Sequence, residues 1–481
     1  MSRRRVLLYN PRGESHILPL ALLHIGSMLP EFDVQIVDGR IELAPESTLA
    51  ELADGAVCLG VTVLTGKPIL DALRASRAVK RRYPNLPVIW GGWHPSLLPE
   101  QCLASPGVDV CVSAQGEEVF REIVLCLAEG RDLGGVTGIS FKRDGVTIKN
   151  PPRAFQNVNS FPRVEFGLID LEKYFAFRGG RRLDYCSSQG CPFECAFCAD
   201  PMVYKQRWSG LGADRVVAEI AEHKKRFRLD QVFFNDDNFF TDIRRAEAIA
   251  RGLIDARVDI QWFGTGRADL LRRMSAEQLA LMRQSGCYKV NVGAESGSAK
   301  VLEDIRKGTL VEEVIESAEK LNRAGIGARF SFIAGFPKEP ASSLADTYRT
   351  VKTLRKINGA FETPIYFYAP YPGTELSERM PALGFEPPQR LEDWEHVDLD
   401  HSIGPWISEP VRKFVPRYNF YLRHAFEPVE RGLGKRVARQ LARLRVRFDF
   451  YRFDFERRLV DLSKRVRTGI RPRQQPMIAE N

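Results

Sequence analysis

Short apolar runs rich in β-branched residues alternate with longer helical stretches through the first 135 residues of the chain. The runs are continuously apolar, which indicates strands covered on both faces of a parallel sheet, and the stretches between them, such as 69–83, are expected to form crossover helices. The alternation predicts an α/β class with a five-stranded, doubly wound, Rossmann-like domain over residues 1–135. The expected strands are Val6–Tyr9, Val34–Val37, Val57–Thr62, Val88–Trp90 and Val110–Val112.

Three glycine-containing loops follow the third, fourth and fifth of these expected strands. They span Thr62–Gly66, Gly91–Ser96 and Gln115–Glu118. Ligands of doubly wound sheets bind outside the carboxyl ends of the strands, and glycine lets a bulky ligand approach the backbone. The sequence therefore predicts a ligand site at this edge, with these candidate residues: Thr62, Gly91, Gly92, Gly116 and Glu117.

The alternation of strands and helices resumes between residues 181 and 376. Six β-rich runs are each followed by a helical stretch, which predicts a partial, TIM-like (β/α)6 barrel with its functional residues at the carboxyl ends of the strands. Between the two units, residues 136–180 contain Gly145, three prolines and little periodicity, so we expect a small hairpin and a linker there. The expected barrel strands are Arg182–Tyr185, Gln231–Asn235, Ile260–Phe263, Lys289–Gly293, Ala328–Phe332 and Pro364–Tyr368.

Three cysteines directly after the first expected barrel strand have the spacing C-x3-C-x2-C. They are Cys191, Cys195 and Cys198. An iron–sulfur cube is normally held by four cysteines, and a structural zinc by four Cys or His ligands, so three thiolates leave a coordination position for a group other than protein. A zinc knuckle or a disulfide pair is the alternative interpretation. Cys186 is a further candidate ligand, but free cysteine is commonly buried and we expect it to be a buried strand residue.

Together with Phe197, the triad resembles the signature of the radical S-adenosylmethionine (SAM) enzymes. Segments that follow the later strands resemble elements of that family in the same order: Asn235–Phe239, Gly266–Asp269, Gly293–Ser298, Gly335–Pro337 and Tyr371–Thr374. The resemblance implies that the cysteines hold a four-iron, four-sulfur (4Fe–4S) cluster. It also implies that the open iron of this cluster is chelated by the amino and carboxylate groups of SAM.

The same resemblance assigns contacts with the cofactors to residues outside the triad. It implies that the loop with Asn235 and Asp236 contacts the amino group of SAM, since an ammonium favours a carboxylate or carbonyl nearby. It further implies that Glu295, followed by Ser296, binds the ribose hydroxyls, and that Arg329 pairs with the SAM carboxylate. Phe197 completes the cofactor-binding set that the resemblance assigns in this unit.

The order of loops in the first unit resembles the cobalamin-binding domain that is fused to many radical SAM enzymes. The segment Pro19–Gly26, which opens the first expected helix, belongs to this likeness. The loop D-x-H-x-x-G, which supplies a histidine to cobalt in other cobalamin proteins, is absent, and neither His16 nor His24 sits in that spacing. The resemblance therefore implies cobalamin held without a histidine on the metal, and the alternative is a domain with this fold but no cofactor.

The last segment, 377–481, is expected to be a mostly helical extension with a disordered tail over 470–481. The formal net charge of the chain is +9, and its basic residues are densest after residue 430. The segment 444–450 alternates strictly, so a strand is the alternative to a helix there. An apolar stripe recurs mostly at three- and four-residue intervals along an arginine-rich sequence: Val437, Leu441, Leu444, Phe448, Tyr451, Phe455, Leu462 and Val466.

Three roles are open for this basic amphipathic segment. It can pack its stripe against the barrel, lie on an anionic bilayer, or contact nucleic acid, which is the least favoured of the three. No run reaches the roughly 18 apolar residues of a spanning helix, and the apolar run at the N-terminus is too short for a signal peptide. We therefore expect a cytoplasmic protein with peripheral membrane contact as an option, and reduced thiols rather than a disulfide framework.

The family resemblance implies the chemistry of such an assembly. A reduced cluster would cleave SAM to a 5′-deoxyadenosyl radical, and cobalamin would carry a methyl group to a substrate radical. The expected function is that of a cobalamin-dependent radical SAM methyltransferase acting on an unactivated carbon of a small molecule, namely a specialised metabolite, lipid or tetrapyrrole. An external donor such as flavodoxin or ferredoxin would supply electrons. The alternatives are an oxidative cyclase or rearrangement enzyme and, more remotely, a non-catalytic cobalamin or iron–sulfur sensor.

Overall fold

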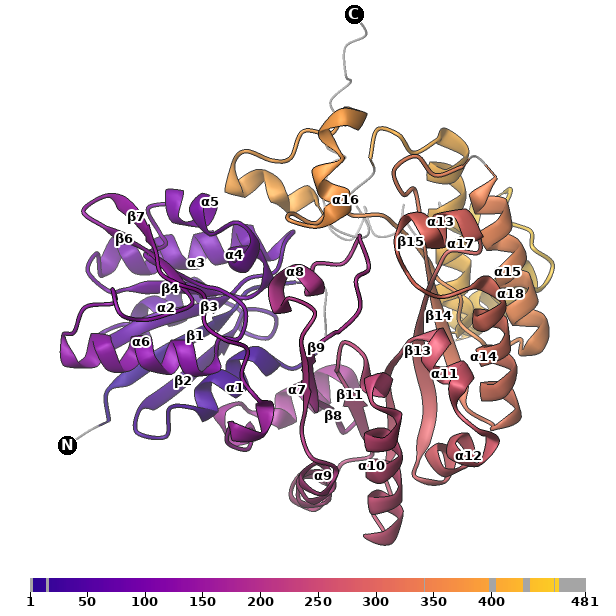
Figure 1. The fold of residues 1–481 in the computed structure, drawn as a ribbon, viewed down its shortest axis with the longest axis horizontal. Helices are drawn as coiled ribbons and strands as arrows, with labels where there is room; N and C mark the ends of the chain where they lie inside the picture. The colour runs from indigo at the N-terminus through magenta and orange to yellow at the C-terminus, as the bar shows by residue number, and fades with distance from the viewer. Residues whose placement is uncertain are drawn as a thin grey trace, which may run out of the picture.

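The computed structural model of the protein describes residues 3–13, 17–340, 342–397, 404–426, 433–453 and 455–457. Two α/β units lie side by side, the N-terminal unit in indigo to purple and the second unit in magenta to orange (Figure 1). The C-terminal helices, in yellow, lie on the outer side of the second unit.

The first unit is a seven-stranded sheet with strand order β2-β1-β3-β4-β5-β6-β7, and its first five strands pair in parallel. Helices α1 (Leu20–Ser27) and α6 (Glu117–Glu129) pack on one face, while α2 (Pro45–Leu52) and α3 (Pro68–Arg82) pack on the other. The five strands expected from the sequence are all present, and both faces of the sheet are covered. They are β1 (Arg5–Asn10), β2 (Asp33–Asp38), β3 (Ala56–Thr62), β4 (Val88–Gly91) and β5 (Val110–Val112).

The hairpin expected between the units belongs to the first sheet. Strands β6 (Ile139–Arg143) and β7 (Val146–Lys149) continue the sheet antiparallel to β5. Asp144 and Gly145 both have positive φ, as a two-residue hairpin turn with the twist of the strands requires. The first sheet therefore extends beyond the boundary at residue 135, because Ile139 and Phe141 bury their side chains in its hydrophobic core.

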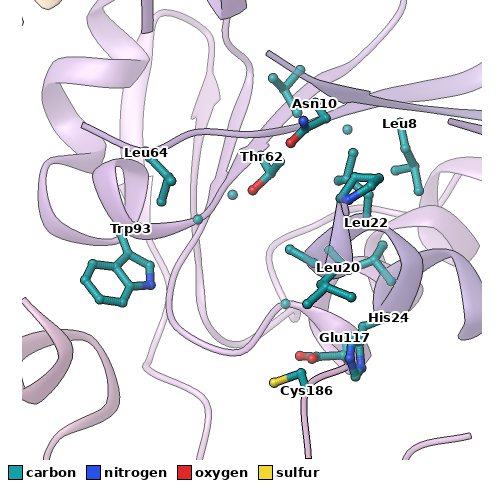
Figure 2. A pocket seen from close by; sticks show the side chains of 18 of the residues that line it. Leu8, Asn10, Leu20, Leu22, His24, Thr62, Leu64, Trp93, Glu117 and Cys186 are labelled. Carbon is teal, nitrogen blue, oxygen red and sulfur yellow. The ribbon is translucent and has the colours of Figure 1, made fainter. Parts of the chain in front are cut away.

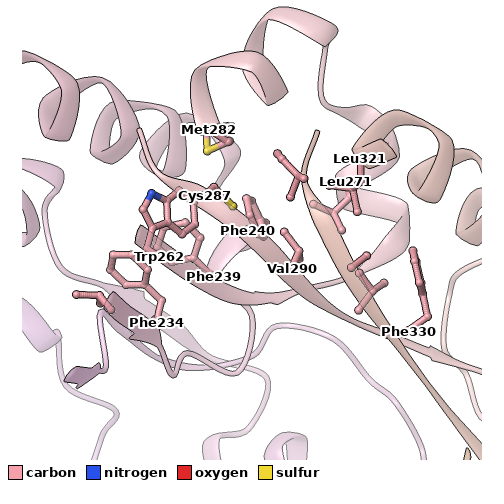
Figure 3. Close-up of a cluster of buried hydrophobic side chains, with 14 of the residues drawn as sticks. Phe234, Phe239, Phe240, Trp262, Leu271, Met282, Cys287, Val290, Leu321 and Phe330 are labelled. Carbon is pink, nitrogen blue, oxygen red and sulfur yellow. The ribbon is translucent and has the colours of Figure 1, made fainter. Parts of the chain in front are cut away.

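The second unit is a curled sheet of six parallel strands in the order β15-β14-β13-β12-β11-β8. Outward-facing aromatic and aliphatic side chains pack under its helices, and Figure 3 shows Phe234, Trp262 and Phe330 in this core. The six expected strands and the partial barrel are confirmed. The strands are β8 (Arg182–Tyr185), β11 (Gln231–Phe234), β12 (Gln261–Gly266), β13 (Cys287–Glu295), β14 (Gly327–Ala334) and β15 (Ile365–Phe367).

Helices cover the outer side of this curled sheet, and shorter elements connect the two units. The helices are α9 (Ala213–Phe227), α10 (Ile243–Asp255), α11 (Ala268–Arg273), α12 (Ala276–Gln284), α13 (Ala299–Asp304), α14 (Val311–Arg323) and α15 (Ser343–Ile357). The remaining elements are α4 (Trp93–Leu97), α5 (Pro99–Ala104), α7 (Leu171–Arg178), α8 (Asp200–Tyr204), α16 (Glu375–Glu378), the hairpin strands β9 (Ser188–Gly190) and β10 (Trp208–Gly210), and the 3-10 turns η1 (Val158–Ser160), η2 (Phe166–Leu168), η3 (Phe239–Thr241), η4 (Pro381–Leu383) and η5 (Leu391–His396).

A segment after the barrel returns to the first unit, so the two units are held together at more than one point. Turn η5 packs along α3, and Leu391, Trp394 and Val397 complete a hydrophobic cluster of the first unit. The Trp394 indole Nε1 donates to Gln101 Oε1 at 2.7 Å. We call the segment 385–397 the strap. Its tryptophan, Trp394, is 2% exposed and lies in that core.

The C-terminal helices α17 (Glu409–Phe426) and α18 (Leu433–Arg447) pack on one another and on the outside of the barrel. Helix α18 buries Ala442 and Val446, whereas the side chains of the expected stripe are exposed. Among the described residues of the stripe, only Tyr451 packs in the core, so packing against the barrel does not account for the others. The alternative of a strand over 444–450 is wrong because α18 continues to Arg447. The exposed members are Val437, Leu441, Leu444, Phe448 and Phe455.

Some expectations for the C-terminal extension fall on residues that the structure does not describe. Leu462, Val466 and the expected disordered tail 470–481 lie outside the described residues, as does His16. Within the described ranges, no helix combines the length and the apolar character needed to cross a membrane.

Candidate active site

A cavity of about 420 Å³ lies between the two units, at the carboxyl ends of the strands of the first sheet. All five residues predicted for the ligand edge line it, namely Thr62, Gly91, Gly92, Gly116 and Glu117. The barrel supplies the opposite wall, with Cys186, Gln189, Tyr204, Asn235 and Asp237. Figure 2 shows side chains that line the cavity, among them Leu20, Leu22, Leu64 and Trp93 of the first unit. The cavity is therefore lined by both units, with mostly apolar side chains from the first.

Glycines shape the part of the cavity wall that belongs to the first unit. Gly92 has φ +98°, and a Cβ there would lie 2.9 Å from the backbone oxygen of Val63. A Cβ on Gly60, in β3, would lie 2.7 Å from the ring of Phe120. At Gly92 the backbone itself requires glycine, and at Gly60 a larger residue would have to displace the Phe120 ring. The absence of side chains at these two positions leaves an open wall against which a broad, flat ligand can lie. The shape of this wall suits the flat face of a corrin ring.

Asp236 anchors the chain that leads into the loop with the three cysteines. This buried carboxylate accepts hydrogen bonds from Ser187 N at 2.6 Å, Ser187 Oγ at 2.6 Å and Ser188 Oγ at 2.8 Å. Burial raises its pKa, although Arg245 and the serine donors act in the opposite direction. Asp236 thus serves to fix the chain between β8 and β9, and its neighbour Asp237 is the carboxylate that lines the cavity.

The three cysteines lie close to one another beside this cavity, and none is in a disulfide. Cys198 N donates to Cys195 O at 3.1 Å. Burial raises the pKa of Cys191 to about 12, and the negative charges of Asp200 and Asp237 add to this effect. Among the described residues no three His, Cys, Asp or Glu side chains converge on a single ion. A four-iron cube takes one sulfur per iron, so its ligands stand wider apart than those of one ion.

Cys186 takes no part in this group. Its Sγ donates to Ser188 O at 3.0 Å, and its side chain lines the cavity at the other end of the loop. The expectation of a buried strand residue is therefore wrong, because Cys186 follows β8 and is only half-buried. Figure 2 shows its sulfur near His24 and Glu117.

Buried acceptors without partners stand next to the cysteine loop. Asp200 is 2% exposed, and within the described chain neither of its carboxylate oxygens has a nitrogen or oxygen donor, while the nearby Cys191 thiol acts to lower its pKa. The amide of Asn238 is equally buried and unpaired there. Burial raises the pKa of Asp200 to about 8, with the charge of Asp237 as a second cause, and burial with the charge of Asp236 raises the pKa of Asp237 to about 6. Such acceptors fit a cationic ligand, such as the ammonium and sulfonium of SAM.

The remaining predicted SAM contacts are distributed along the barrel. Glu295 has φ +59°, and its Oε1 accepts from Lys307 Nζ at 2.7 Å. Ser296 is buried against Thr347. Phe197 packs on Phe336 with ring centroids 5.8 Å apart.

Arg329 does not join this group of residues. It lies near the amino end of β14, whereas the cysteine loop follows the carboxyl end of β8. Its guanidinium contacts Tyr366 Oη at 2.5 Å and Glu362 Oε2 at 3.5 Å. The structure therefore does not bring Arg329 to the cysteine loop, and its pairing with the SAM carboxylate stays a prediction.

Two residues that the sequence analysis did not select connect the parts of the site. Gln189, within the cysteine loop, accepts from Gln115 Nε2 at 2.8 Å and donates to Glu117 Oε1. It thereby joins the loop after β5 to the loop of the cysteines. Arg267, which directly follows β12, donates from Nη1 to Cys195 Sγ at a distance of 3.4 Å. Arg267 lies inside the segment Gly266–Asp269 that resembles the family, whereas the only sequence signal for Gln189 was its place two residues before the cysteine triad.

Comparisons with known proteins agree with this arrangement. A B12 binding domain model matches residues 5–124, and a radical SAM superfamily model matches residues 185–351. The chain is 30% identical over 438 residues to an uncharacterized methyltransferase of Pyrococcus horikoshii, with 88% of this chain and 94% of that protein covered. It is 25% identical to the anaerobic magnesium-protoporphyrin IX monomethyl ester cyclase of Synechocystis sp., over 69% of each chain. Its fold is similar to that of the cobalamin-dependent S-adenosylmethionine radical enzyme OxsB with aqua-cobalamin and SAM bound, with a TM-score of 0.72, 19% identity, and 97% of this chain and 75% of that chain covered.

Proposed function

The chain belongs to the family of radical SAM enzymes that carry an N-terminal cobalamin-binding domain, and we propose that it is a cobalamin-dependent methyltransferase acting on an unactivated carbon. One observation carries this proposal. A single cavity has the glycine loops of the first unit on one wall and barrel residues beside the cysteine loop on the other. A substrate there would meet both cofactors at once, as a methyl transfer to a carbon radical requires.

The residues of this chain divide the binding of the cofactors between the two units. We assign the cobalamin contacts to Thr62, Gly91, Gly92, Gly116 and Glu117. The cluster ligands are Cys191, Cys195 and Cys198. When bound, the cluster and SAM supply a carbon-centred radical, and cobalamin supplies the methyl group.

The carboxylates next to the cysteine loop would orient SAM. Asp237 lines the cavity, and its charge lies close enough to Cys191 and Cys198 to raise the pKa of both thiols. We assign it, with Asp200, to the ammonium of SAM in place of Asp236, whose oxygens are already hydrogen-bonded to the cysteine loop. Glu295 would bind the ribose from the end of β13.

A cyclase-like reaction is the second candidate, because a relative is named as a magnesium-protoporphyrin IX monomethyl ester cyclase. The two functions differ in whether the methyl group of SAM is transferred. The test is an anaerobic incubation of the cluster-loaded protein with aquacobalamin, titanium citrate and SAM labelled with deuterium in its methyl group. Methyl transfer predicts labelled methylcobalamin and S-adenosylhomocysteine by mass spectrometry. Formation of 5′-deoxyadenosine without labelled methylcobalamin would favour cyclisation or rearrangement.

The same incubation separates an enzyme from a non-catalytic sensor. A sensor would bind the cofactors but yield neither 5′-deoxyadenosine nor S-adenosylhomocysteine. For the enzyme we propose a small-molecule substrate of the specialised metabolite, lipid or tetrapyrrole class and an electron donor of the flavodoxin or ferredoxin type. The cytoplasm suits the nine free cysteines and a reduced cluster.

We further propose that the C-terminal segment touches an anionic membrane. The exposed apolar side chains of α18 and the residues after it alternate with exposed arginines, and Phe448 alone is 70% exposed. We call this the arginine–phenylalanine surface. Its apolar groups suit the acyl boundary of a bilayer, and its charge suits anionic headgroups. It consists of Arg436, Val437, Leu441, Arg443, Leu444, Arg447, Phe448, Phe450, Arg452 and Phe453.

Sedimentation with vesicles tests this surface. We expect the protein to bind phosphatidylglycerol vesicles at low salt, to bind phosphatidylcholine vesicles much less, and to be released at high ionic strength. Changing Leu441, Leu444 and Phe448 together to Ser should abolish binding. Leu43→Ser, at a side chain that is 94% exposed on the first unit, is the matched control. Binding that the triple variant retains would contradict the proposal, and a concentration-dependent dimer that it loses would assign the surface to a second copy.

A further inference from the structure

The sulfur of Cys195 differs from those of the other two cluster cysteines in its surroundings. Arg267 Nη1 donates to Cys195 Sγ at 3.4 Å. Within the described residues, no other side-chain donor contacts the sulfur of one of the three cysteines. The guanidinium and the sulfur come from segments 72 residues apart in sequence, because Arg267 directly follows β12 and Cys195 lies in the loop after β9.

Several contacts hold the guanidinium of Arg267 in this position. Its side chain is only 7% exposed, and its Cζ lies 3.8 Å from the ring centroid of Phe193, which is in the cysteine loop. Nε donates to Asp269 Oδ1 at 3.0 Å. Nη2 donates to Lys307 O and, at 3.3 Å, to Thr309 Oγ1. With the other two nitrogens occupied, Nη1 is left directed at the sulfur.

The carboxylate of Asp269 largely balances the positive charge of Arg267. The pair is buried, with side-chain exposures of 7% and 6%. Thr309 Oγ1 also donates to Asp269 at 3.1 Å, so the carboxylate is held from two sides. What Arg267 presents to Cys195 is therefore chiefly an oriented N–H donor rather than an unbalanced charge.

A hydrogen bond to a cluster sulfur has a known electrostatic consequence. The donor withdraws electron density from the thiolate and stabilises the reduced cluster, which carries one more negative charge, so the reduction potential rises. We propose that Arg267 is a positioning residue that raises the reduction potential of the cluster through its N–H···S bond to Cys195. This inference rests on the proposed function, because it requires that the triad holds the cluster.

The role is specific to the transfer of one electron from the external donor to the cluster. A higher potential makes the oxidised cluster easier to reduce, while it makes the reduced cluster a weaker donor towards SAM. Arg267 would set the balance between these two steps. Its contact with Phe193 also couples the donor to the backbone of the cysteine loop, so the hydrogen bond and the loop are placed by the same group.

The test is a redox titration of the cluster-loaded protein without SAM, cobalamin or substrate, followed by electron paramagnetic resonance. Arg267→Met keeps the length and apolar body of the side chain but removes the donor and the charge. The double variant R267M/D269N removes both partners of the ion pair, so its net charge matches that of the wild type. We expect a more negative midpoint potential in both variants, with the larger shift in Arg267→Met.

Two further variants complete the design. Thr309→Val perturbs the same buried network without touching the sulfur, and its potential should equal that of the wild type. In Arg267→Lys the single side-chain nitrogen is expected to pair with Asp269, so the hydrogen bond to Cys195 is lost and the midpoint potential should again be more negative. This variant provides the test of the hydrogen bond if neither methionine variant loads iron.

A wild-type potential in a fully loaded R267M/D269N would overturn the proposed hydrogen bond. The same result in a fully loaded Arg267→Lys would overturn it as well. If the wild type itself holds no cluster, the proposed function fails first, and iron analysis distinguishes that outcome from a cluster whose potential is insensitive to Arg267.

Discussion

The two walls of the cavity use different chemistry. The first unit contributes glycines and aliphatic side chains on loops after parallel strands, so its wall discriminates by shape. The second unit contributes a thiol, an amide and a carboxylate to the opposite wall, from Cys186, Asn235 and Asp237. Buried ion pairs such as Lys307–Glu295 and Arg267–Asp269 lie outside the wall, at the same end of the barrel strands. A corrin ring offers a large flat body, whereas a cluster and SAM offer charge. One fold principle, a parallel sheet with loops at its carboxyl edge, thus serves two kinds of recognition.

The largest expected effect is the loss of the iron–sulfur cluster while cobalamin binding at the other wall is kept. Changing Cys191, Cys195 or Cys198 to Ala should abolish cluster assembly, because the segment 191–198 contains no fourth cysteine to replace the lost ligand. Iron and sulfide analysis with visible absorption of anaerobically purified protein measures this. Cobalamin binding should persist, and Cys186→Ala, whose sulfur faces the cavity, should keep its cluster. A full cluster in all three variants would refute the ligand assignment.

The next largest effect concerns the strap and its contribution to the stability of the first unit. Trp394 is 2% exposed and completes a core of the first unit, so Trp394→Ala should cost about 3–5 kcal/mol of unfolding free energy. The readout is the urea midpoint of the first unit, and Trp394→Phe should lose less. A cost below about 1 kcal/mol would mean that the strap contributes little to the core of the first unit.

A smaller effect is expected from adding one methyl group to the shape-based wall. Gly92→Ala places a Cβ against Val63 O in a left-handed backbone, which should cost about 1–2 kcal/mol and lower cobalamin affinity about tenfold. Titration of the protein with cobalamin by absorbance measures it, while cluster content should not change. Gly55→Ala is the control, since Gly55 also has positive φ but no atom within 4 Å of its Cβ. Equal losses in both variants would contradict a role for shape.

The smallest expected effect concerns the ionic group at the edge of the first sheet. Burial acts to raise the pKa of Asp38, but the hydrogen bonds and charge of Arg40 outweigh it, so the pKa lies below its usual value of 3.8. A carboxyl with a depressed pKa in the folded state stabilises the protein above its unfolded pKa, and this stability is lost as the pH falls through the folded value.

Unfolding free energy should therefore decline below pH 3.8, with a slope from this group of at most about 1.4 kcal/mol per pH unit. Asp38→Asn should flatten this part of the curve, as measured by urea unfolding at a series of pH values. A variant curve parallel to that of the wild type would show that Asp38 does not contribute to the acid sensitivity.

Local patterns were sufficient for most of the architecture. Continuous apolar runs predicted the first parallel sheet, because a strand covered on two faces must be apolar at successive positions. Six β-rich runs, each followed by a helical stretch, predicted the second sheet. The spacing of Cys191, Cys195 and Cys198 predicted a ligand triad, and the structure places all three in one loop. The pattern did not tell Asp236 from Asp237, whose backbone positions differ by one residue and whose partners differ completely.

The sequence by itself determined the elements and the reactive loop, because both depend on residues that are neighbours in the chain. Only the tertiary structure decided that Arg267 contacts Cys195, that Gln189 joins the two cofactor loops, and that the arginine–phenylalanine surface is turned outward. These features depend on which helix faces and loop ends meet when the two units pack. Hydrophobic periodicity predicts that one face of a helix is apolar, but the packing of the whole molecule determines which face is buried.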